Sequence, residues 1–217
     1  MDQNQVINYY EDHAEQYASA TKNVDLSETQ NKFLSLIPEG GRILDFGCGS
    51  GRDTKYFLEK GYKVDAVDGC KKLCELASEH CGIEVKHMMF DELSERGVYD
   101  GIWACASVLH LKKEDILDVL FKMLIALKIN GYIYMSFKYG DFDGVRDNKH
   151  YTDFTEESFR MFFNEFYCDY FGGNITVFSE SYDSYKPILK EQWKTVDTLP
   201  DRGDLVWLNL IIQKVPD

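Results

Sequence analysis

A short apolar run followed by alternating glycines constrains this 217-residue chain more than any other feature. Residues 42–46 are typical of a buried strand, and Gly47, Gly49 and Gly51 follow them directly. Alternating glycines let the main chain turn sharply and approach a ligand closely, because no Cβ intervenes. A helix that begins near Gly51 would direct its free N–H groups and its positive dipole end at the same place. The sequence therefore predicts a ligand-binding turn between a first strand and a first helix.

An acidic residue at the end of the next predicted strand indicates the kind of ligand. Asp68 follows the apolar run 63–67, where its carboxylate can accept both hydroxyls of a ribose. A role as helix N-cap is the alternative for Asp68. The dinucleotide fingerprint G-x-G-x-x-G would require glycine at position 52, which is Arg52. An NAD-type oxidoreductase is therefore a weaker hypothesis than an enzyme that binds a different nucleoside.

Apolar runs alternate with helical periods along the chain, which indicates β/α units and a parallel sheet. We expect a polar loop at 138–154, and Thr155 should be the N-cap of the helix that follows it. The last two strands should form an antiparallel pair at the sheet edge. The expected strands are 42–46, 63–67, 84–87, 99–105, 132–137, 174–182 and 204–214, and the expected helices are 6–21, 27–36, 51–60, 70–80, 114–127 and 155–168.

The G-x-G-x-G pattern, with Asp45 two residues before its first glycine, resembles motif I of the class I S-adenosylmethionine-dependent methyltransferases. The similarity covers most of residues 30–140, and within it 49–53 and 99–111 resemble the small-molecule, tellurite-resistance-like branch. The resemblance implies a Rossmann-like α/β fold: a seven-stranded, mostly parallel sheet with an antiparallel last strand and helices on both faces. It implies one domain over 1–217. Its parts would be an N-terminal helical lid (1–40), a cofactor-binding core (41–138) and a substrate-side loop, helix and edge strands (139–217).

The resemblance also implies S-adenosyl-L-methionine as the cofactor and assigns roles to single residues. Asp45 would orient the amino-acid part of the cofactor, Asp68 would hold the ribose, and Tyr17 would close over the methionine end. Either Asp91 or Met89 would contact the adenine. The full set of expected cofactor-binding residues is Tyr17, Asp45, Gly47, Cys48, Gly49, Arg52, Asp53, Asp68, Gly69, Met89, Phe90, Asp91 and Ala104.

A general base is needed only if the methyl acceptor arrives protonated. His110, just after the fourth core strand, is the first candidate for that base and Tyr139 is the second, although a purely structural loop histidine is an equal alternative for His110. The turns typical of nucleobase methylation, Asn- or Asp-Pro-Pro-aromatic and Pro-Cys, are missing after this strand. We therefore expect transfer to a small molecule of unidentified kind. A non-catalytic protein that binds the cofactor is the alternative function.

Composition restricts the partners further. The net charge of −13 disfavours nucleic acid, although Arg52, Lys138 and Arg146 could still form a local positive pocket. No secretory signal and no membrane-crossing apolar run occur in the sequence, which predicts a cytoplasmic protein without a membrane partner. The spacing Cys70-x3-Cys74 suggests zinc, but without a Cys-x2-Cys pair we expect packing cysteines and no metal. The sequence does not indicate an oligomeric state.

Overall fold

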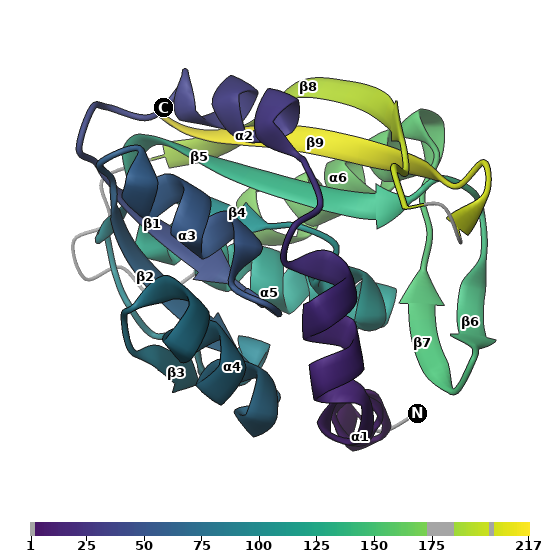
Figure 1. The fold of residues 1–217 in the computed structure, drawn as a ribbon. Coiled ribbons are helices and arrows are strands. Elements are labelled where there is room, and N and C mark those ends of the chain that lie inside the picture. Colours follow the sequence, from purple (N-terminus) through teal and green to yellow (C-terminus); the bar gives the residue numbers. More distant parts are fainter. Residues whose placement is uncertain (1–2, 173–184, 200–201) are drawn as a thin grey trace.

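The structure, a computed structural model, describes residues 3–172, 185–199 and 202–217. Within these ranges seven strands form one sheet in the order β3-β2-β1-β4-β5-β9-β8 (Figure 1). The first five run parallel, while β9 lies antiparallel between β5 and β8. The expected fold class is therefore confirmed. The strands are β1 (Arg42–Phe46), β2 (Lys63–Asp68), β3 (Val85–His87), β4 (Tyr99–Ala104), β5 (Leu127–Lys138), β8 (Tyr185–Val196) and β9 (Val206–Pro216).

Helices cover both faces of this sheet. On one face lie α2 (Ser27–Leu34), α3 (Arg52–Glu59) and α4 (Lys71–Cys81), and on the other lie α5 (Lys113–Ala126) and α6 (Glu156–Phe171). Thr155 is the N-cap of α6, as expected. The first helix, α1 (Gln3–Thr21), contacts α4 and a small hairpin, and it lies outside the two helical layers (Figure 1). Among the described residues, no helix has the length and hydropathy that crossing a bilayer requires.

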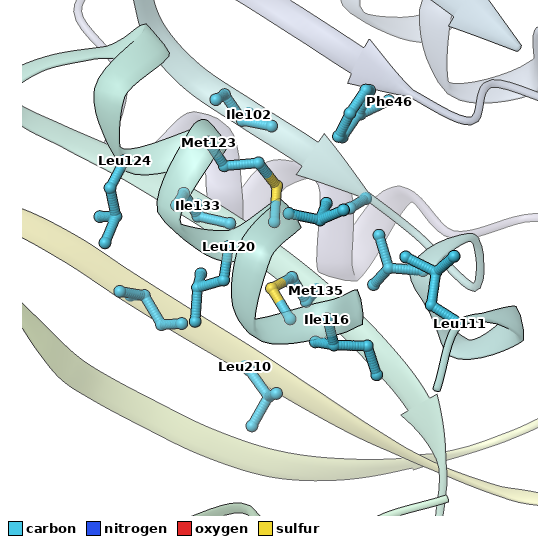
Figure 2. Packing of buried hydrophobic residues seen from close by; sticks show 14 of the residues in the cluster. Phe46, Ile102, Leu111, Ile116, Leu120, Met123, Leu124, Ile133, Met135 and Leu210 are labelled. Atoms are coloured by element: carbon cyan, nitrogen blue, oxygen red, sulfur yellow. The ribbon is translucent and has the colours of Figure 1, made fainter. Parts of the chain in front are cut away.

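The larger core lies between the sheet and α5. Figure 2 shows Leu120 and Met123 of this helix beside Ile102, Ile133 and Met135 from the two central strands. All five side chains are fully buried. Alternate residues of a strand point to the same face, so β4 and β5 each present a continuous apolar stripe to the helix. This packing fixes the two strands whose carboxyl ends border the site described below.

Two expectations about the second half of the chain were wrong or lie outside the described residues. The stretch 138–154 is not a plain loop, because it contains the hairpin of β6 (Asp143–Arg146) and β7 (Lys149–Thr152). Its two-residue turn places Asp147 and Asn148 at positive φ, as tight hairpin turns require. The strand expected at 174–182 lies outside the described residues. The strand that pairs with β9 covers Tyr185–Val196, a segment whose mixture of charged and apolar residues did not predict one.

Candidate functional site

The glycine turn after β1 has the sharp geometry that the sequence predicts. Gly47, Gly49 and Gly51 have φ of +83°, +55° and +76°, in the left-handed region that favours glycine. A Cβ on Gly47 would lie 2.5 Å from the Cβ of Ser107, and a Cβ on Gly51 would lie 2.5 Å from the Sγ of Cys81. At two of the three glycines, the space that a Cβ would need is therefore occupied by a neighbouring side chain of the protein.

The turn borders a hollow of about 80 Å³ at the carboxyl ends of the parallel strands. We call it the first hollow. It is lined by Val6, Ile7, Tyr10, Tyr17, Gly47, Gly49, Asp68, Gly69, Leu73, Met88, Met89, Phe90, Ala106, Ser107 and His110.

Asp68 is held at this hollow by two main-chain donors. Its Oδ2 accepts a hydrogen bond from the N–H of Gly49 at 2.9 Å, and its Oδ1 accepts one from the N–H of Cys70 at 2.8 Å. Burial raises the pKa of Asp68, while these two N–H groups oppose the shift. The N-cap position of α4 is Cys70 and not Asp68. Each carboxylate oxygen retains acceptor capacity for a further hydrogen bond, such as one from a hydroxyl group.

Arg52 and Asp53, two of the expected cofactor-binding residues, lie outside the first hollow. They form a buried ion pair in which the Nη2 and Nε of Arg52 donate to Asp53 at 2.8 and 2.9 Å. Asp53 also accepts from Trp103 Nε1 at 2.8 Å and from Gln30 Nε2 at 2.6 Å. Burial opposes ionisation of Asp53, but the charge of Arg52 and these donors lower its pKa. The pair joins α2, α3 and β4.

Asp45, Cys48 and Ala104 are likewise buried and do not line the first hollow. Asp45 accepts a hydrogen bond from the hydroxyl of Thr54 at 2.5 Å. Burial and the negative charge of Asp53 raise the pKa of Asp45 to about 8. The motif acid therefore stabilises the strand-to-helix connection and does not itself line the first hollow.

The segment after β3 separates the two alternatives for an adenine contact. Met89 and Phe90 line the first hollow, together with Met88, which sequence reasoning did not select. Asp91 is exposed and does not line it. The main-chain N–H of Met89 donates to Glu92 Oε2 at 2.7 Å, which fixes this short turn.

His110 has both ring nitrogens engaged. Nδ1 lies 2.8 Å from the main-chain oxygen of His150, and Nε2 lies 3.0 Å from the hydroxyl of Tyr10. A carbonyl oxygen can only accept, so Nδ1 carries the proton and Nε2 accepts from the Tyr10 hydroxyl. Burial lowers the pKa of His110 to about 4, and the nearby charge of Lys149 adds to the effect. The imidazole is therefore neutral at physiological pH and a weak base.

A second hollow of about 500 Å³, open to solvent, adjoins the first. The two share Tyr10, Tyr17, Ala106 and His110. Tyr139, the second candidate base, lines neither of them, and its ring lies 4.7 Å from the Nζ of Lys194 on the exposed surface. The second hollow is lined by Tyr9, Tyr10, His13, Gln16, Tyr17, Ala20, Ala106, Leu109, His110, Lys138, Lys149, Tyr151, Arg202, Leu205 and Trp207.

Comparison with known proteins agrees with this arrangement. Residues 43–131 match the family model of the methyltransferase domain. A solved structure of the 1,6-didemethyltoxoflavin N1-methyltransferase of Burkholderia thailandensis superposes with a TM-score of 0.71 at 17% identity, over 97% of this chain and 88% of that one. The chain has the class I methyltransferase fold.

Other matches show how far this fold determines activity. An uncharacterized methyltransferase of Staphylococcus carnosus is 27% identical over 108 residues, which are 50% of this chain and 51% of the relative. The chain thus spans about half the length of this curated relative. The cyclase SpnF also has the fold, with a TM-score of 0.69 at 11% identity over 98% of this chain and 96% of that one. The methyltransferase fold alone does not specify methyl transfer.

Several residues of the two hollows were missed by sequence reasoning, for different reasons. Tyr10 shares a helical face with Tyr17, so the same periodicity could have found it. Ala106 lines both hollows because its backbone has φ of +51°, which no sequence signal for alanine predicts. Lys149 reaches the second hollow only through the unexpected hairpin.

The cysteines near the glycine turn make packing contacts. Cys74 Sγ donates to the main-chain oxygen of Asp68 at 3.3 Å, and Cys81 Sγ donates to that of Gly51 at 3.1 Å. Within the described ranges, no three His, Cys, Asp or Glu side chains converge to hold a metal ion.

Proposed function

We propose that the protein is an S-adenosylmethionine-dependent methyltransferase that transfers a methyl group to a small-molecule acceptor by in-line displacement. One observation carries the proposal: two adjoining hollows at the carboxyl ends of the parallel strands meet at Tyr10, Tyr17, Ala106 and His110. The first would hold the cofactor and the second the acceptor, so that the two reactants meet at the shared wall. The small acceptor bound in the Burkholderia relative supports this division.

The first hollow offers side chains that could contact the ribose, the adenine and the methionine part of the cofactor. Asp68 would accept the ribose hydroxyls, and Met89 and Phe90 would contact the adenine by sulfur and ring. Tyr17 would close over the methionine end, since its ring already lies against Gly49. Gly69 lets α1 pack close to the first hollow, because a Cβ at this position would lie only 2.8 Å from the side chain of Ile7. We propose on this basis that α1 acts as the lid of a single-domain enzyme.

The reaction requires alignment more than proton transfer. When bound, S-adenosylmethionine supplies a methyl group on a positively charged sulfur, which becomes a neutral thioether as the acceptor's lone pair forms the new bond. His110 is poorly suited to act as a base, because Nε2 already accepts from Tyr10 and its pKa is about 4. Tyr139 lies outside both hollows, so we propose no role for it. Closing the hollows against water and orienting the acceptor are the functions left to the chain.

A finer assignment to the tellurite-resistance-like, small-molecule branch rests on the resemblance of residues 49–53 and 99–111, and we propose it only on that ground. Residence in the cytoplasm and the lack of a nucleic-acid partner are likewise predictions from composition and charge.

Isothermal titration with S-adenosylmethionine and S-adenosylhomocysteine tests the proposal, with Asp68→Asn as the variant and Asp91→Asn as the matched control. Loss of a charge-assisted hydrogen bond, about 1.5–3 kcal/mol, should weaken binding by Asp68→Asn roughly tenfold or more. Asp91→Asn should bind like the unaltered protein, because Asp91 does not line the first hollow. No binding of either compound by the unaltered protein, or equal effects of the two variants, would contradict the proposal.

A further inference from the structure

The second hollow has a charge opposite to that of the whole protein. The chain carries a net charge of −13, yet Lys138, Lys149 and Arg202 line this hollow. No Asp or Glu is among its described lining residues. Charges in a partly enclosed cleft focus the local potential, so the hollow attracts anions despite the acidic surface.

The two lysines lack a carboxylate partner among the described residues. Lys138 Nζ lies 3.8 Å from the ring centroid of Tyr151, and Lys149 Nζ lies 3.6 Å from that of Tyr9. Lys149 is only 9% exposed. Arg202 differs from them, because its Nη1 already pairs with Asp197 at 3.1 Å. An anion that enters the hollow would therefore meet two ammonium groups that ring faces, and not carboxylates, hold in position.

The lysines are also close enough to other cations for mutual repulsion to matter. Burial and the positive charge of Arg146 lower the pKa of Lys138 to about 8, and Arg202 and Lys149 contribute in the same direction. Arg146 itself is paired with Asp153 at 2.7 Å, so the excess charge lies on the lysines. A bound anion would relieve this repulsion, since it favours the charged form of each lysine.

Four tyrosines and one tryptophan also line the second hollow. Tyr9, Tyr10, Tyr17 and Tyr151 line it together with Trp207. Tyr10 and Tyr17 meet edge to face with ring centroids 5.2 Å apart, at the boundary with the first hollow. Aromatic walls accept a planar ring by offset or edge-to-face stacking. The lining therefore combines a flat apolar surface with two cations.

From this combination we infer that the methyl acceptor is a small aromatic carboxylate, whose anionic group lies between Lys138 and Lys149 and whose ring packs among the tyrosines. This inference rests on the proposed function, which makes the second hollow the acceptor site. A neutral aromatic compound has no negative charge to pair with the two lysines, and an inorganic anion has no ring to pack against the tyrosines. A hydroxyl on that ring would take the methyl group and release its proton to the solvent that the second hollow opens to, because both ring nitrogens of His110 are engaged.

The test is a titration of three hydroxybenzoate isomers into protein saturated with S-adenosylhomocysteine, beside 2-hydroxybenzamide and cyclohexanecarboxylate. At least one hydroxybenzoate should bind, and at least tenfold more tightly than either the neutral amide or the non-aromatic acid. Lys138→Gln and Lys149→Gln should each weaken that binding at least tenfold and leave the affinity for S-adenosylhomocysteine within threefold. Lys149→Arg, which keeps the charge, should bind within about threefold of the unaltered protein.

Lys194→Gln is the matched control, because Lys194 also lies over a tyrosine ring but outside both hollows. It should change nothing. If S-adenosylhomocysteine binds but no hydroxybenzoate binds below about 10 mM, the inference is wrong and the proposed function stands. Equal affinity for acid and amide, or no effect of either lysine variant, would overturn it as well. If S-adenosylhomocysteine itself does not bind, the proposed function fails and the assignment of an acceptor fails with it.

Discussion

Replacing Arg52 by glutamine distinguishes a structural arginine from a cofactor-binding one. The substitution removes two hydrogen bonds, at 2.8 and 2.9 Å, and the only described cation paired with Asp53. Asp53, whose side chain is 7% exposed, would keep its donors from Trp103 and Gln30 but not its counter-charge.

The expected loss of stability follows from the burial of this pair. Removing one partner of a buried ion pair costs about 3–5 kcal/mol, and the partial exposure of Arg52 points to the lower end, about 3 kcal/mol. For a chain of this size, that loss lowers the melting temperature by about 6–12 °C. Arg42→Gln is the control, because Arg42 pairs with Asp65 at a comparable 2.8 Å on the surface and should lose at most about 1 kcal/mol.

Urea denaturation followed by circular dichroism at pH 7 measures both variants. Titration with S-adenosylhomocysteine then measures the ligand affinity of the folded Arg52→Gln protein, which should stay within threefold. Equal stability losses in Arg52→Gln and Arg42→Gln would refute the structural reasoning. A variant that keeps its stability but loses the ligand would show that Arg52 contacts the cofactor after all.

Three further predictions follow from the packing and the pKa values. Leu120→Ala should lower the free energy of unfolding by about 2–5 kcal/mol in urea denaturation, and a loss below about 1 kcal/mol would contradict the packing in Figure 2. Gly61→Ala should lower the free energy of unfolding by about 1–2 kcal/mol, because alanine is strained in the left-handed conformation. Gly51→Ala should lower it by about 1–3 kcal/mol more, because only this Cβ would also meet a neighbouring side chain. Equal losses of stability in the two variants would refute this reasoning. In an NMR titration His110 should take up its proton near pH 4. The histidine of the unfolded chain is protonated below about pH 6.5, so His110 should lower the stability of the fold as the pH falls from about 6.5 to 4. An NMR titration midpoint of His110 near pH 6.5 would contradict this prediction.

The part of the site that local sequence determines was predictable. Gly47 and Gly49 follow a strand directly, and Asp68 closes the next parallel strand, so their meeting depends only on β1 and β2 pairing in register. The same argument fails for Asp45 and Arg52, which have the right spacing but bond to Thr54 and Asp53 and do not line the first hollow. Whether a side chain near a turn faces a ligand or the core depends on its partners, and the partners that hold Asp53 inside, Trp103 and Gln30, come from distant segments.

The second hollow was beyond sequence reasoning for the same reason. Arg146 was selected as part of a positive pocket, but it pairs with Asp153, while Lys149 takes that position through the hairpin of β6 and β7. Lys138, at the end of β5, was selected correctly as a cation of such a pocket. These three basic residues, Arg146, Lys138 and Lys149, differ only in the neighbours that the tertiary structure gives them.

The first helix, α1, forms part of the wall of both hollows. Tyr10 and Tyr17 belong to the walls of both, and Glu11 fastens the same helix to α4 by accepting from the N–H of Lys71 at 2.6 Å. Swinging this helix outward would uncover both compartments in a single motion. Substrate entry and product escape would then share one gate, and a change that loosens the helix should speed the exchange of both compounds together.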